Sequence, residues 1–331
     1  MKRLDLCHTP TPVWHHDALD RLMGFELWVK RDDMTSGAAA GNKLRKLEYL
    51  LADALEQGAD VVITCGGEQS NHARATAIAA RELGLGSRLL LRTSTPLTPP
   101  ADSGNLLLDR LVGAELELIT PEQYRERATH LAAAAAELTR RGHRPYVIPE
   151  GGSNGLGALG YVRCVEELAE QQRAGRLPGS IDLLAVACGS GGTAAGVALG
   201  LGRYGGLAER AAAFAVCDDR SYFERVVEDI VGQARALDQA LPAPGPLDIY
   251  DQYRGPAYGV ASQEQLDFML QVARCSGLLL EPSYTGKALF GLSQLPHKPR
   301  RALFVHSGGL PGLLAAPEVM APAMARAAAC S

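Results

Sequence analysis

The sequence has few of the features that mark a disulfide-bonded, zinc-binding or membrane-spanning protein. Its seven cysteines are an odd number, are scattered along the chain and form no Cys-x-x-Cys pair, which argues against a disulfide framework and a structural zinc site. No apolar run approaches the roughly 18 residues needed to cross a bilayer, and the first residues lack the apolar core of a signal peptide. We therefore expect a cytoplasmic protein with reduced thiols and no metal site.

Strong charge of either sign is also missing. The formal net charge is -4 over 331 residues, so nothing indicates a nucleic-acid partner or an anionic membrane surface. A chain of this length is too long for one small core and suits one large or two moderate domains. The bulk properties thus exclude several kinds of partner and name none.

Short apolar strands alternate with amphipathic helices along most of the chain. Apolar residues recur at helical spacing over Leu44–Gln57, and a second helix is predicted over Ser70–Leu83. The segments Thr93–Gly104 and Leu241–Leu247 are predicted to be loops. The predicted strands are Asp60–Cys65, Arg88–Leu91, Leu116–Ile119, Tyr146–Ile148, Ile181–Ala187, Ala213–Val216 and Ala302–Val305. This rhythm predicts an α/β protein with mostly parallel sheets and helices on both faces.

Ligands of open parallel sheets bind beyond the carboxyl ends of the strands, and a glycine-rich segment follows one predicted strand there. Its glycines allow backbone N–H groups to approach an anion, and the start of the next helix adds a favourable dipole. The candidate phosphate ligands are Gly189, Ser190, Gly191, Gly192 and Thr193. The pattern fits pyridoxal phosphate and a dinucleotide about equally, because Asp218 and Asp219 suit a ribose, and a tight turn is the structural alternative.

Lys43 lies at the start of the first predicted helix, where a cation is disfavoured. The helix dipole repels it by up to ~1 kcal/mol, and the neighbouring cations Arg45 and Lys46 add to the repulsion. Both effects predict a lowered pKa, which an amine needs to attack an aldehyde. A solvated surface lysine is the alternative interpretation.

The segment Gln69-Ser-Asn-His72 follows the predicted strand Asp60–Cys65 and two glycines. Ser70 is predicted to cap the next helix and to leave N–H groups that suit an amino-acid carboxylate. Capping alone would explain Ser70, but it would not explain Asn71 and His72.

Tyrosines and small hydroxyl residues gather in the last third of the chain. Tyr284 and Thr285 precede a predicted helix, Tyr258 lies upstream, and Ser307 follows the predicted strand Ala302–Val305. The tyrosines either pack in the core or stack on a planar ring.

Four ordered motifs, Gly41–Tyr49, Gln69–His72, Gly189–Thr193 and Tyr284–Lys287, together carry a specific resemblance. The chain resembles the D-cysteine desulfhydrase / 1-aminocyclopropane-1-carboxylate deaminase family of fold-type II pyridoxal-phosphate enzymes, from about Thr9 to Leu313. The segments Gly104–Ala114, Pro149–Asn154 and Val216–Phe223 resemble the desulfhydrase branch, its plant-type members in particular. The joint match overrules the dinucleotide, since a dinucleotide explains neither Lys43 nor Ser70.

The resemblance implies a role for each matched residue. It implies a Schiff base between Lys43 and pyridoxal 5'-phosphate, Asn71 on the pyridoxal hydroxyl, Gly189 to Thr193 on the phosphate, Tyr284 against the ring and Thr285 near the ring nitrogen. It implies substrate contacts for Gln69, Ser70, Asn71, His72 and Ser307, and catalytic roles for Ser70, Tyr258 and Tyr284. It also implies a tryptophan synthase β-like fold with a large domain (1–45 and 152–331), a small domain (46–151) and a homodimeric assembly.

Two positions separate the branches of this family. The deaminase branch has a glutamate at the position of Thr285 and a leucine at the position of Ser307, and small hydroxyl residues at both are similar to the desulfhydrase branch. A neutral hydroxyl near the ring nitrogen makes a weaker electron sink than a carboxylate does, which suffices when a thiolate leaves. The chain also departs from the family at four positions: Glu68, Glu150, Glu281 and Ser283.

The resulting hypothesis is β-elimination from a small amino acid. For D-cysteine the products would be pyruvate, ammonia and hydrogen sulfide, with Lys43 removing the α-proton. The alternatives are a lyase for L-cysteate or another β-substituted amino acid, 1-aminocyclopropane-1-carboxylate deaminase, a β-replacement synthase, and a non-catalytic amino-acid-binding protein. A sulfonate substrate would need cationic donors that the sequence does not place.

Overall fold

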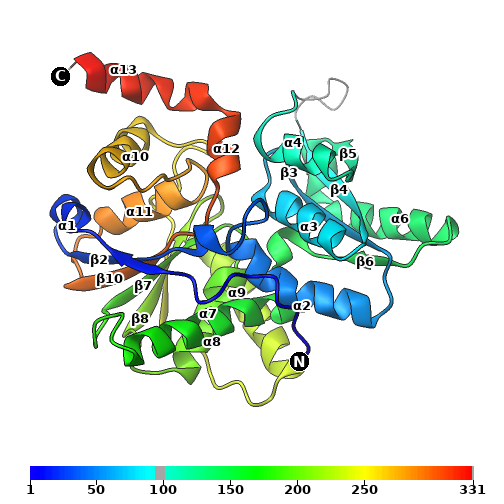
Figure 1. Cartoon of the computed structure of the whole chain (residues 1–331), viewed down its shortest axis with the longest axis horizontal. Helices are drawn as coiled ribbons and strands as arrows, with labels where there is room; N and C mark the ends of the chain where they lie inside the picture. The colour runs from blue at the N-terminus through cyan, green and yellow to red at the C-terminus, as the bar shows by residue number, and fades with distance from the viewer. Residues whose placement is uncertain (94–100, 330–331) are drawn as a thin grey trace.

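Two separate sheets organise the chain in a computed structural model that describes residues 1–93 and 101–329 (Figure 1). The larger sheet has the order β1 (Val13–His15), β2 (Glu26–Lys30), β10 (Arg301–Val305), β7 (Leu183–Cys188), β8 (Arg210–Ala215) and β9 (Leu247–Tyr250). The smaller sheet has the order β5 (Glu115–Ile119), β4 (Gly86–Arg92), β3 (Val61–Gly67) and β6 (Pro145–Val147). All neighbouring strands are parallel except β1 and β2. The predicted α/β architecture with two mostly parallel sheets is confirmed.

Helices cover both faces of the larger sheet. One face carries α7 (Gly155–Arg173), α8 (Gly192–Arg203) and α9 (Arg220–Leu237), and the other carries α1 (Asp17–Met23), α10 (Gln263–Ser276) and α11 (Thr285–Ser293) (Figure 1). Successive side chains of β7 alternate between the two cores, with Leu184 and Val186 in one and Leu183 and Ala185 in the other. Burial on both faces explains why this strand is a continuous apolar run.

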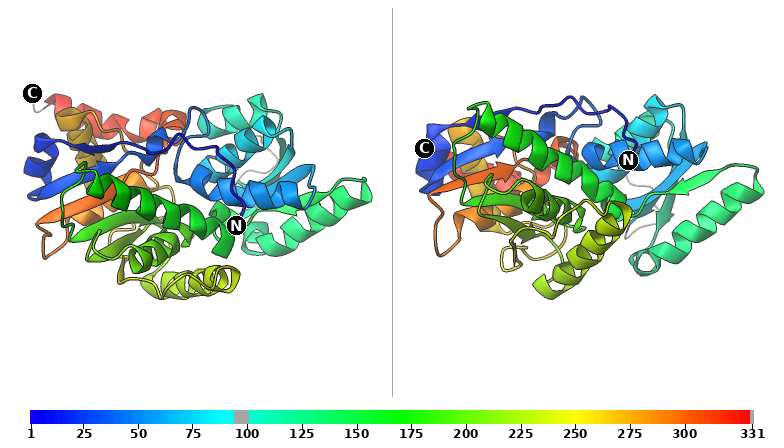
Figure 2. Two further views of the ribbon diagram at one scale, coloured as in Figure 1. Left: turned by 60° about the horizontal axis from the view of Figure 1, so that its bottom comes forward. Right: turned by 90° about the horizontal axis from the view of Figure 1, so that it is seen from below.

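The smaller sheet forms a second lobe beside the first (Figure 2). Val62 of β3 packs with α2 (Asn42–Glu56) and α3 (Asn71–Glu82), whereas Val61 and Ile63 pack with α6 (Arg127–Arg140) on the opposite face. The remaining elements are α4 (Gly104–Leu111), α5 (Pro121–Arg125), α12 (Leu310–Ala315), α13 (Ala321–Ala329) and the 3-10 turns η1 (Asp32–Met34), η2 (Glu150–Gly152) and η3 (Pro317–Val319). No helix of the described residues is long and apolar enough to cross a membrane.

The predicted strands all occur, and their ends differ from the prediction by at most three residues. Three short strands, β1, β2 and β9, were not predicted, because each is only three to five residues long and contains polar or charged residues. The predicted loop Leu241–Leu247 ends at the first residue of β9, and most of the predicted loop Thr93–Gly104 lies outside the described residues. The division into two domains stays a prediction, and its boundary at residues 45 and 46 falls inside α2.

A buried ion cluster fixes the start of α2 against the larger sheet. The Arg45 guanidinium donates to both carboxylate oxygens of Asp32 at 2.8 Å and to Glu167 of α7 at 2.9 Å. Lys30 of β2 also pairs with Glu167, and the Tyr161 hydroxyl donates to Asp32 at 2.7 Å. Each charge is compensated and hydrogen-bonded, which buried ion pairs require. This cluster holds the turn of helix that carries Lys43.

Candidate active site

A cavity of about 820 Å³ opens beyond the carboxyl ends of β3, β4, β7 and β8, which is where parallel sheets bind ligands. It is lined by eleven of the residues predicted from the sequence: Lys43, Ser70, Asn71, His72, Gly189, Ser190, Gly191, Thr193, Tyr258, Tyr284 and Ser307. Gln69, Gly192 and Thr285 are outside its lining. The fold therefore gathers segments that are far apart in the sequence into one site.

Lys43 is the second residue of α2 and extends into this cavity. Its Nζ donates to Oδ1 of Asn42 at 3.1 Å and lies 5.7 Å from the centroid of the Tyr284 ring. Burial lowers the pKa of Lys43 to about 8, and Arg74 acts in the same direction, whereas Glu281 opposes the shift. The predicted lowering is confirmed, and a fraction of the amine is neutral near physiological pH.

The predicted cause of that shift needs correction. Arg45 and Lys46 were both expected to repel Lys43. The charge of Arg45 is compensated by Asp32 and Glu167 in the buried cluster, and the repulsion between Lys43 and Lys46 lowers the pKa of Lys46 instead. The cation that lowers the pKa of Lys43 is Arg74 of α3, after burial itself. Arg74 also donates to the carbonyl oxygens of Ala38 and Ala40, which fastens the segment before Lys43 onto α3. The sequence could not show this, because the two residues meet only through the fold.

The glycines of the loop between β7 and α8 line a hollow, called the glycine cradle below, in which a side chain on any of them would collide with neighbouring atoms. A Cβ at Gly189 would lie 2.8 Å from Cε1 of Tyr284, and Gly191 has a φ of +79°, which favours glycine. A Cβ at Gly192 would lie 2.6 Å from Oγ of Ser153. That oxygen accepts the Gly192 N–H at 3.2 Å and shares a hydrogen bond with the Ser190 hydroxyl at 2.8 Å. Without side chains in the way, the backbone N–H groups at the start of α8 can approach a phosphate closely.

Lys46 is a functional candidate that the sequence reasoning missed. Its side chain is fully buried beside this cradle, and its Nζ donates to the carbonyl oxygen of Gly151 and to Oγ of Ser153, both at 3.1 Å. No carboxylate of the described residues forms an ion pair with it, and burial lowers its pKa well below the ordinary value. A buried cation without a counter-charge beside a glycine cradle fits an anionic phosphate. The available signal was its spacing of three residues from Lys43, which puts both on one helix face.

Ser70 caps α3 as predicted, since its Oγ accepts the N–H of Ala73 at 3.1 Å. The first N–H groups of the helix have no acceptor within it and can meet a carboxylate. Gln69 does not share that role, because its side chain bonds to the backbone of Ser103 and Asn105 and lies outside the cavity lining. The predicted substrate contact of Gln69 is therefore not supported.

His72 lines the cavity, and its ring is hydrogen-bonded to the hydroxyl of Thr64 on β3. The Thr64 hydroxyl donates to the carbonyl oxygen of Ile148 at 2.9 Å, so Nε2 of His72 must donate to that hydroxyl at 2.8 Å. Nδ1 then carries a lone pair, and it has no partner among the described residues. Burial and the nearby lysines lower the pKa of His72, and the backbone of Pro149 acts in the opposite direction. The predicted substrate contact of His72 stays a prediction.

Tyr258 and Tyr284 share a hydroxyl–hydroxyl hydrogen bond of 2.5 Å at the cavity. Burial raises the pKa of Tyr258 to about 12 and that of Tyr284 well above its ordinary value, so both hydroxyls keep their protons at neutral pH. The Arg92 guanidinium carbon lies 5.2 Å from the centroid of the Tyr258 ring and 5.0 Å from that of Tyr124. These cation–π contacts with two tyrosine rings keep the Arg92 guanidinium in the cavity wall.

Glu281 organises the segment that carries Tyr284. Its buried carboxylate accepts the backbone N–H groups of Ser283, Tyr284 and Thr285 at 2.8, 2.6 and 2.8 Å. Burial raises the pKa of Glu281, and these donors act in the opposite direction. Oγ1 of the fully buried Thr285 accepts the Glu281 N–H at 2.9 Å, which leaves its hydroxyl hydrogen to donate elsewhere.

Of the four departures from the family pattern, Glu150 is the one that lines the cavity. It accepts a hydrogen bond from the Tyr124 hydroxyl at 2.6 Å and forms an ion pair with Nε of Arg127 at 2.9 Å. Arg92 and Arg127 were not assigned to the site from the sequence, because they come from separate segments of the smaller lobe.

The comparisons agree with this geometry. The family model described as "Pyridoxal-phosphate dependent enzyme" matches residues 4–308, which is most of the chain. The chain belongs to the pyridoxal-phosphate-dependent enzyme family. It is 42% identical to the Arabidopsis thaliana "Bifunctional D-cysteine desulfhydrase/1-aminocyclopropane-1-carboxylate deaminase, mitochondrial", covering 96% of this chain and 81% of the relative. It is 40% identical to the D-cysteine desulfhydrase of Serratia proteamaculans, covering 95% of each.

Solved structures of pyridoxal-phosphate enzymes support the same fold. The crystal structure of a 1-aminocyclopropane-1-carboxylate deaminase homologue matches with a TM-score of 0.88 and 36% identity, covering 98% of this chain and 96% of that one. The glycine cradle and the buried Lys46 fit the phosphate of this cofactor, and the lowered pKa of the Lys43 amine fits its aldehyde. The predicted cofactor is thus confirmed by family membership, and the chain offers residues that suit it.

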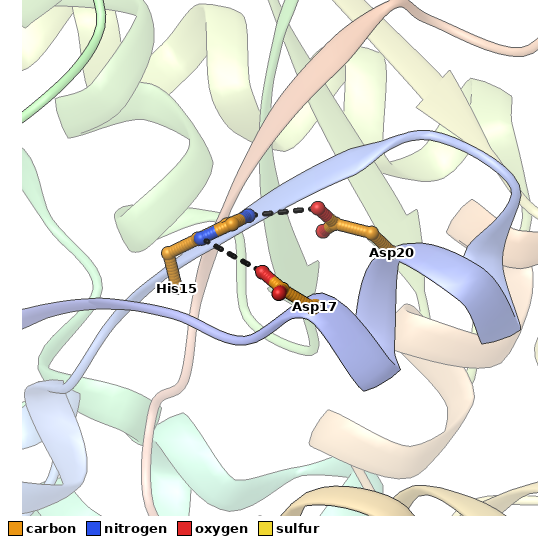
Figure 3. A group of neighbouring side chains, drawn as sticks. All are labelled: His15, Asp17 and Asp20. Carbon is orange, nitrogen blue, oxygen red and sulfur yellow. Dashed lines mark hydrogen bonds and ion pairs between the residues drawn. The ribbon is translucent and has the colours of Figure 1, made fainter.

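A histidine–aspartate group away from the cavity has an ordinary structural explanation (Figure 3). His15, Asp17 and Asp20 place three possible metal-ligand atoms within 4.8 Å of one another. Nε2 of His15 bonds to Asp20 at 2.7 Å, and the other Asp20 oxygen accepts the N–H of Leu27 at 2.8 Å. The His15 ring also stacks on Trp28, with centroids 5.0 Å apart. These contacts join β1, α1 and β2.

Proposed function

We propose that this protein is a β-eliminating lyase that acts on D-cysteine and releases pyruvate, ammonia and hydrogen sulfide. The observation that supports this most is the pairing of a reactive lysine, Lys43, with neutral hydroxyl residues where a deaminase would have a carboxylate and a leucine. The relatives from Arabidopsis thaliana and Serratia proteamaculans carry D-cysteine desulfhydrase in their names, which agrees with the proposal.

The residues that would hold the cofactor surround the cavity on three sides. The N–H groups and hydroxyls of Gly189 to Thr193, with Lys46 behind them, would bind the phosphate. Asn71 would bind the hydroxyl of the pyridoxal ring, and Tyr284 would lie against one side of that ring. The Thr285 hydroxyl has a hydrogen to donate, which suits an unprotonated ring nitrogen. When bound, pyridoxal phosphate delocalises the electron pair left on the substrate after proton removal.

Proton transfer falls to Lys43 and the two tyrosines. Because the pKa of Lys43 is about 8, its amine can take the α-proton near neutral pH. The first N–H groups of α3 and the cap Ser70 would hold the substrate carboxylate. Tyr258 and Tyr284 keep their protons and share one hydrogen bond, so one hydroxyl can donate to a leaving thiolate while the other remains bonded.

A second candidate function is supported by the cations of the cavity wall. The sequence placed no donors for an anionic β-substituent, whereas the structure places Arg92 and Arg127 in the lining. Glu150 neutralises part of that charge through Arg127, and Arg92 is held between two aromatic rings. A lyase for L-cysteate or a similar acidic amino acid is therefore the alternative that the geometry favours.

Two measurements test the proposal. Purified wild-type protein should show a visible absorption band of bound cofactor, and Lys43→Ala should lose it. Sulfide, sulfite and 2-oxo acids are then measured with D-cysteine, L-cysteine, L-cysteate and 1-aminocyclopropane-1-carboxylate. Sulfide from D-cysteine supports the principal function, and sulfite from L-cysteate supports the second. No visible band in the wild-type protein would refute both.

The predicted assembly and location belong to the same proposal. A homodimer and a division into a large domain (1–45 and 152–331) and a small domain (46–151) follow from the sequence resemblance, and a cytoplasmic location was expected from the composition. Light scattering coupled to gel filtration measures the mass of the particle, and a mass equal to one chain would contradict the homodimer. Limited proteolysis that releases the smaller sheet intact would support the domain division.

A further inference from the structure

A buried asparagine on α4 is hydrogen-bonded to the segment that carries Asn71. Asn105 has no exposed surface and lies outside the residues that line the cavity. Its Nδ2 donates to the backbone carbonyl oxygen of Gln69 at 2.9 Å and to Oδ1 of Asn71 at 3.0 Å. Its backbone N–H donates to Oε1 of Gln69 at 2.9 Å, and Nε2 of Gln69 donates to the carbonyl oxygen of Ser103 at 3.1 Å. These bonds join α4 to the start of α3.

This chain of contacts determines which way both amides point. The oxygen and nitrogen of an amide side chain are assigned from their hydrogen-bond partners. The backbone carbonyl of Gln69 can only accept, so the group of Asn105 that faces it must be the NH2. The same NH2 faces Asn71, which must present its carbonyl oxygen there. The NH2 end of Asn71 is therefore left for the cavity that Asn71 lines.

We propose that Asn105 is a positioning residue that makes Asn71 a hydrogen-bond donor toward the cofactor. The inference rests on the proposed function, in which Asn71 meets the ring oxygen of pyridoxal phosphate. A donor stabilises that oxygen in its ionised form, whereas a carbonyl in the same place would favour the neutral hydroxyl. Asn105 thus sets the ionisation of the cofactor without touching it.

The packing around Asn105 agrees with a functional role. A Cβ at Gly104 would lie 2.4 Å from the carbonyl oxygen of Pro311 and 2.7 Å from Oε1 of Gln69, so α4 is held close to both segments. Oδ1 of Asn105 is buried and has no partner among the described residues. An unsatisfied buried oxygen is costly, and a leucine of similar size would avoid it. Only the two hydrogen bonds that its NH2 donates offset that cost.

Absorption spectra of the purified holoenzyme test this role. The ionised ring oxygen gives a band in the visible and the neutral hydroxyl a band in the near ultraviolet. In Asn105→Asp the carboxylate has no hydrogen to donate, so the Asn71 amide turns its NH2 toward it and its carbonyl toward the cavity. We expect the ratio of the visible to the ultraviolet band to fall about ten-fold or more, the effect of losing a hydrogen bond to a charged oxygen.

Three further variants make the result specific. Asn71→Ala should lower the same ratio, and adding Asn105→Asp to Asn71→Ala should cause no further change, because Asn105 acts through Asn71. Asn105→Ala, which introduces no charge, should also lower the ratio. It serves as the test if Asn105→Asp fails to fold. Leu106→Ala removes a buried side chain from the same helix and should reduce stability while leaving the ratio unchanged.

The outcomes separate this inference from the proposed function. A wild-type protein without a visible band would refute the cofactor site itself. A normal wild-type spectrum with an unchanged ratio in folded Asn105→Asp and Asn105→Ala would refute the role of Asn105 alone. A ratio that falls equally in Leu106→Ala, or falls further in the double variant than in Asn71→Ala, would show that α4 acts through general packing.

Discussion

Replacing Lys46 by methionine should stabilise the protein without its cofactor and weaken cofactor binding at the same time. The unfolded lysine is charged at neutral pH, so folding must bury that charge or release its proton, and either costs free energy. Methionine has a similar length and removes this cost, which is several kcal/mol for an unpaired buried ion. The change also removes two hydrogen bonds, to Gly151 and Ser153, worth ~1 kcal/mol each. We expect a net gain of ~1–3 kcal/mol for the apoprotein.

The holoenzyme should respond in the opposite direction. A hydrogen bond from an ammonium group to a phosphate contributes ~1.5–3 kcal/mol, so its loss should raise the dissociation constant of pyridoxal phosphate by about ten- to a hundred-fold. Urea unfolding of the apoprotein and a fluorescence titration with the cofactor measure the two effects. A Lys46→Met variant that loses stability, or that binds the cofactor as tightly as the wild type, would refute the reasoning.

The stability difference should also depend on pH. Burial lowers the pKa of folded Lys46 below the ordinary value of 10.5, so the unfolded chain binds more protons than the folded chain does. The contribution of Lys46 to the free energy of unfolding of the wild-type apoprotein should therefore become less unfavourable as the pH rises toward 10.5. Lys46→Met lacks this contribution, and its advantage should shrink over the same range. An advantage that is constant with pH would assign the effect to packing.

Three other changes probe the rest of the site. Because the neutral amine of Lys43 is the nucleophile and its pKa is about 8, the rate of cofactor capture by the apoprotein should rise with pH and level off above that value, as followed by absorbance. A rate that does not change between about pH 6.5 and 9 would contradict this. Gly189→Ala places a methyl group 2.8 Å from the Tyr284 ring, so kcat should fall about ten-fold or more while bound cofactor remains visible. An unchanged kcat would mean that the position of the Tyr284 ring does not matter for the reaction. Arg45→Met leaves Asp32 without its ion-pair partner and should lower the free energy of unfolding by ~3–5 kcal/mol in urea titrations. A loss below ~1 kcal/mol would mean that other groups compensate.

The sequence predicted the parts of the site that lie next to strands. Parallel strands bring their carboxyl ends to one edge of a sheet, so the segments after β7 and β10 were expected to meet, and they do. The segment after β3 reaches the same cavity from the smaller sheet. The cap Ser70 could be predicted because it depends on the next three residues only.

Contacts between distant segments could not be predicted. Arg74 acts on Lys43 from another helix, and Arg92 enters the wall from the end of a strand that carries no recognisable motif. Glu281 was noted as a departure from the family, but the folding of its carboxylate onto three backbone N–H groups appears only in three dimensions. Burial, which decides the pKa of Lys43 and Lys46, is likewise a property of the packed chain.

The strand order of the larger sheet has a consequence for synthesis on the ribosome. β10 lies between β2 and β7, although it is the last strand of the chain to be made. Until it emerges, β1 and β2 cannot join β7, β8 and β9, and the edges of β2 and β7 remain unpaired. The smaller sheet is built from one continuous stretch of chain and can close much earlier. We therefore expect nascent chains to carry a formed small lobe before the larger sheet, which carries the glycine cradle, is complete.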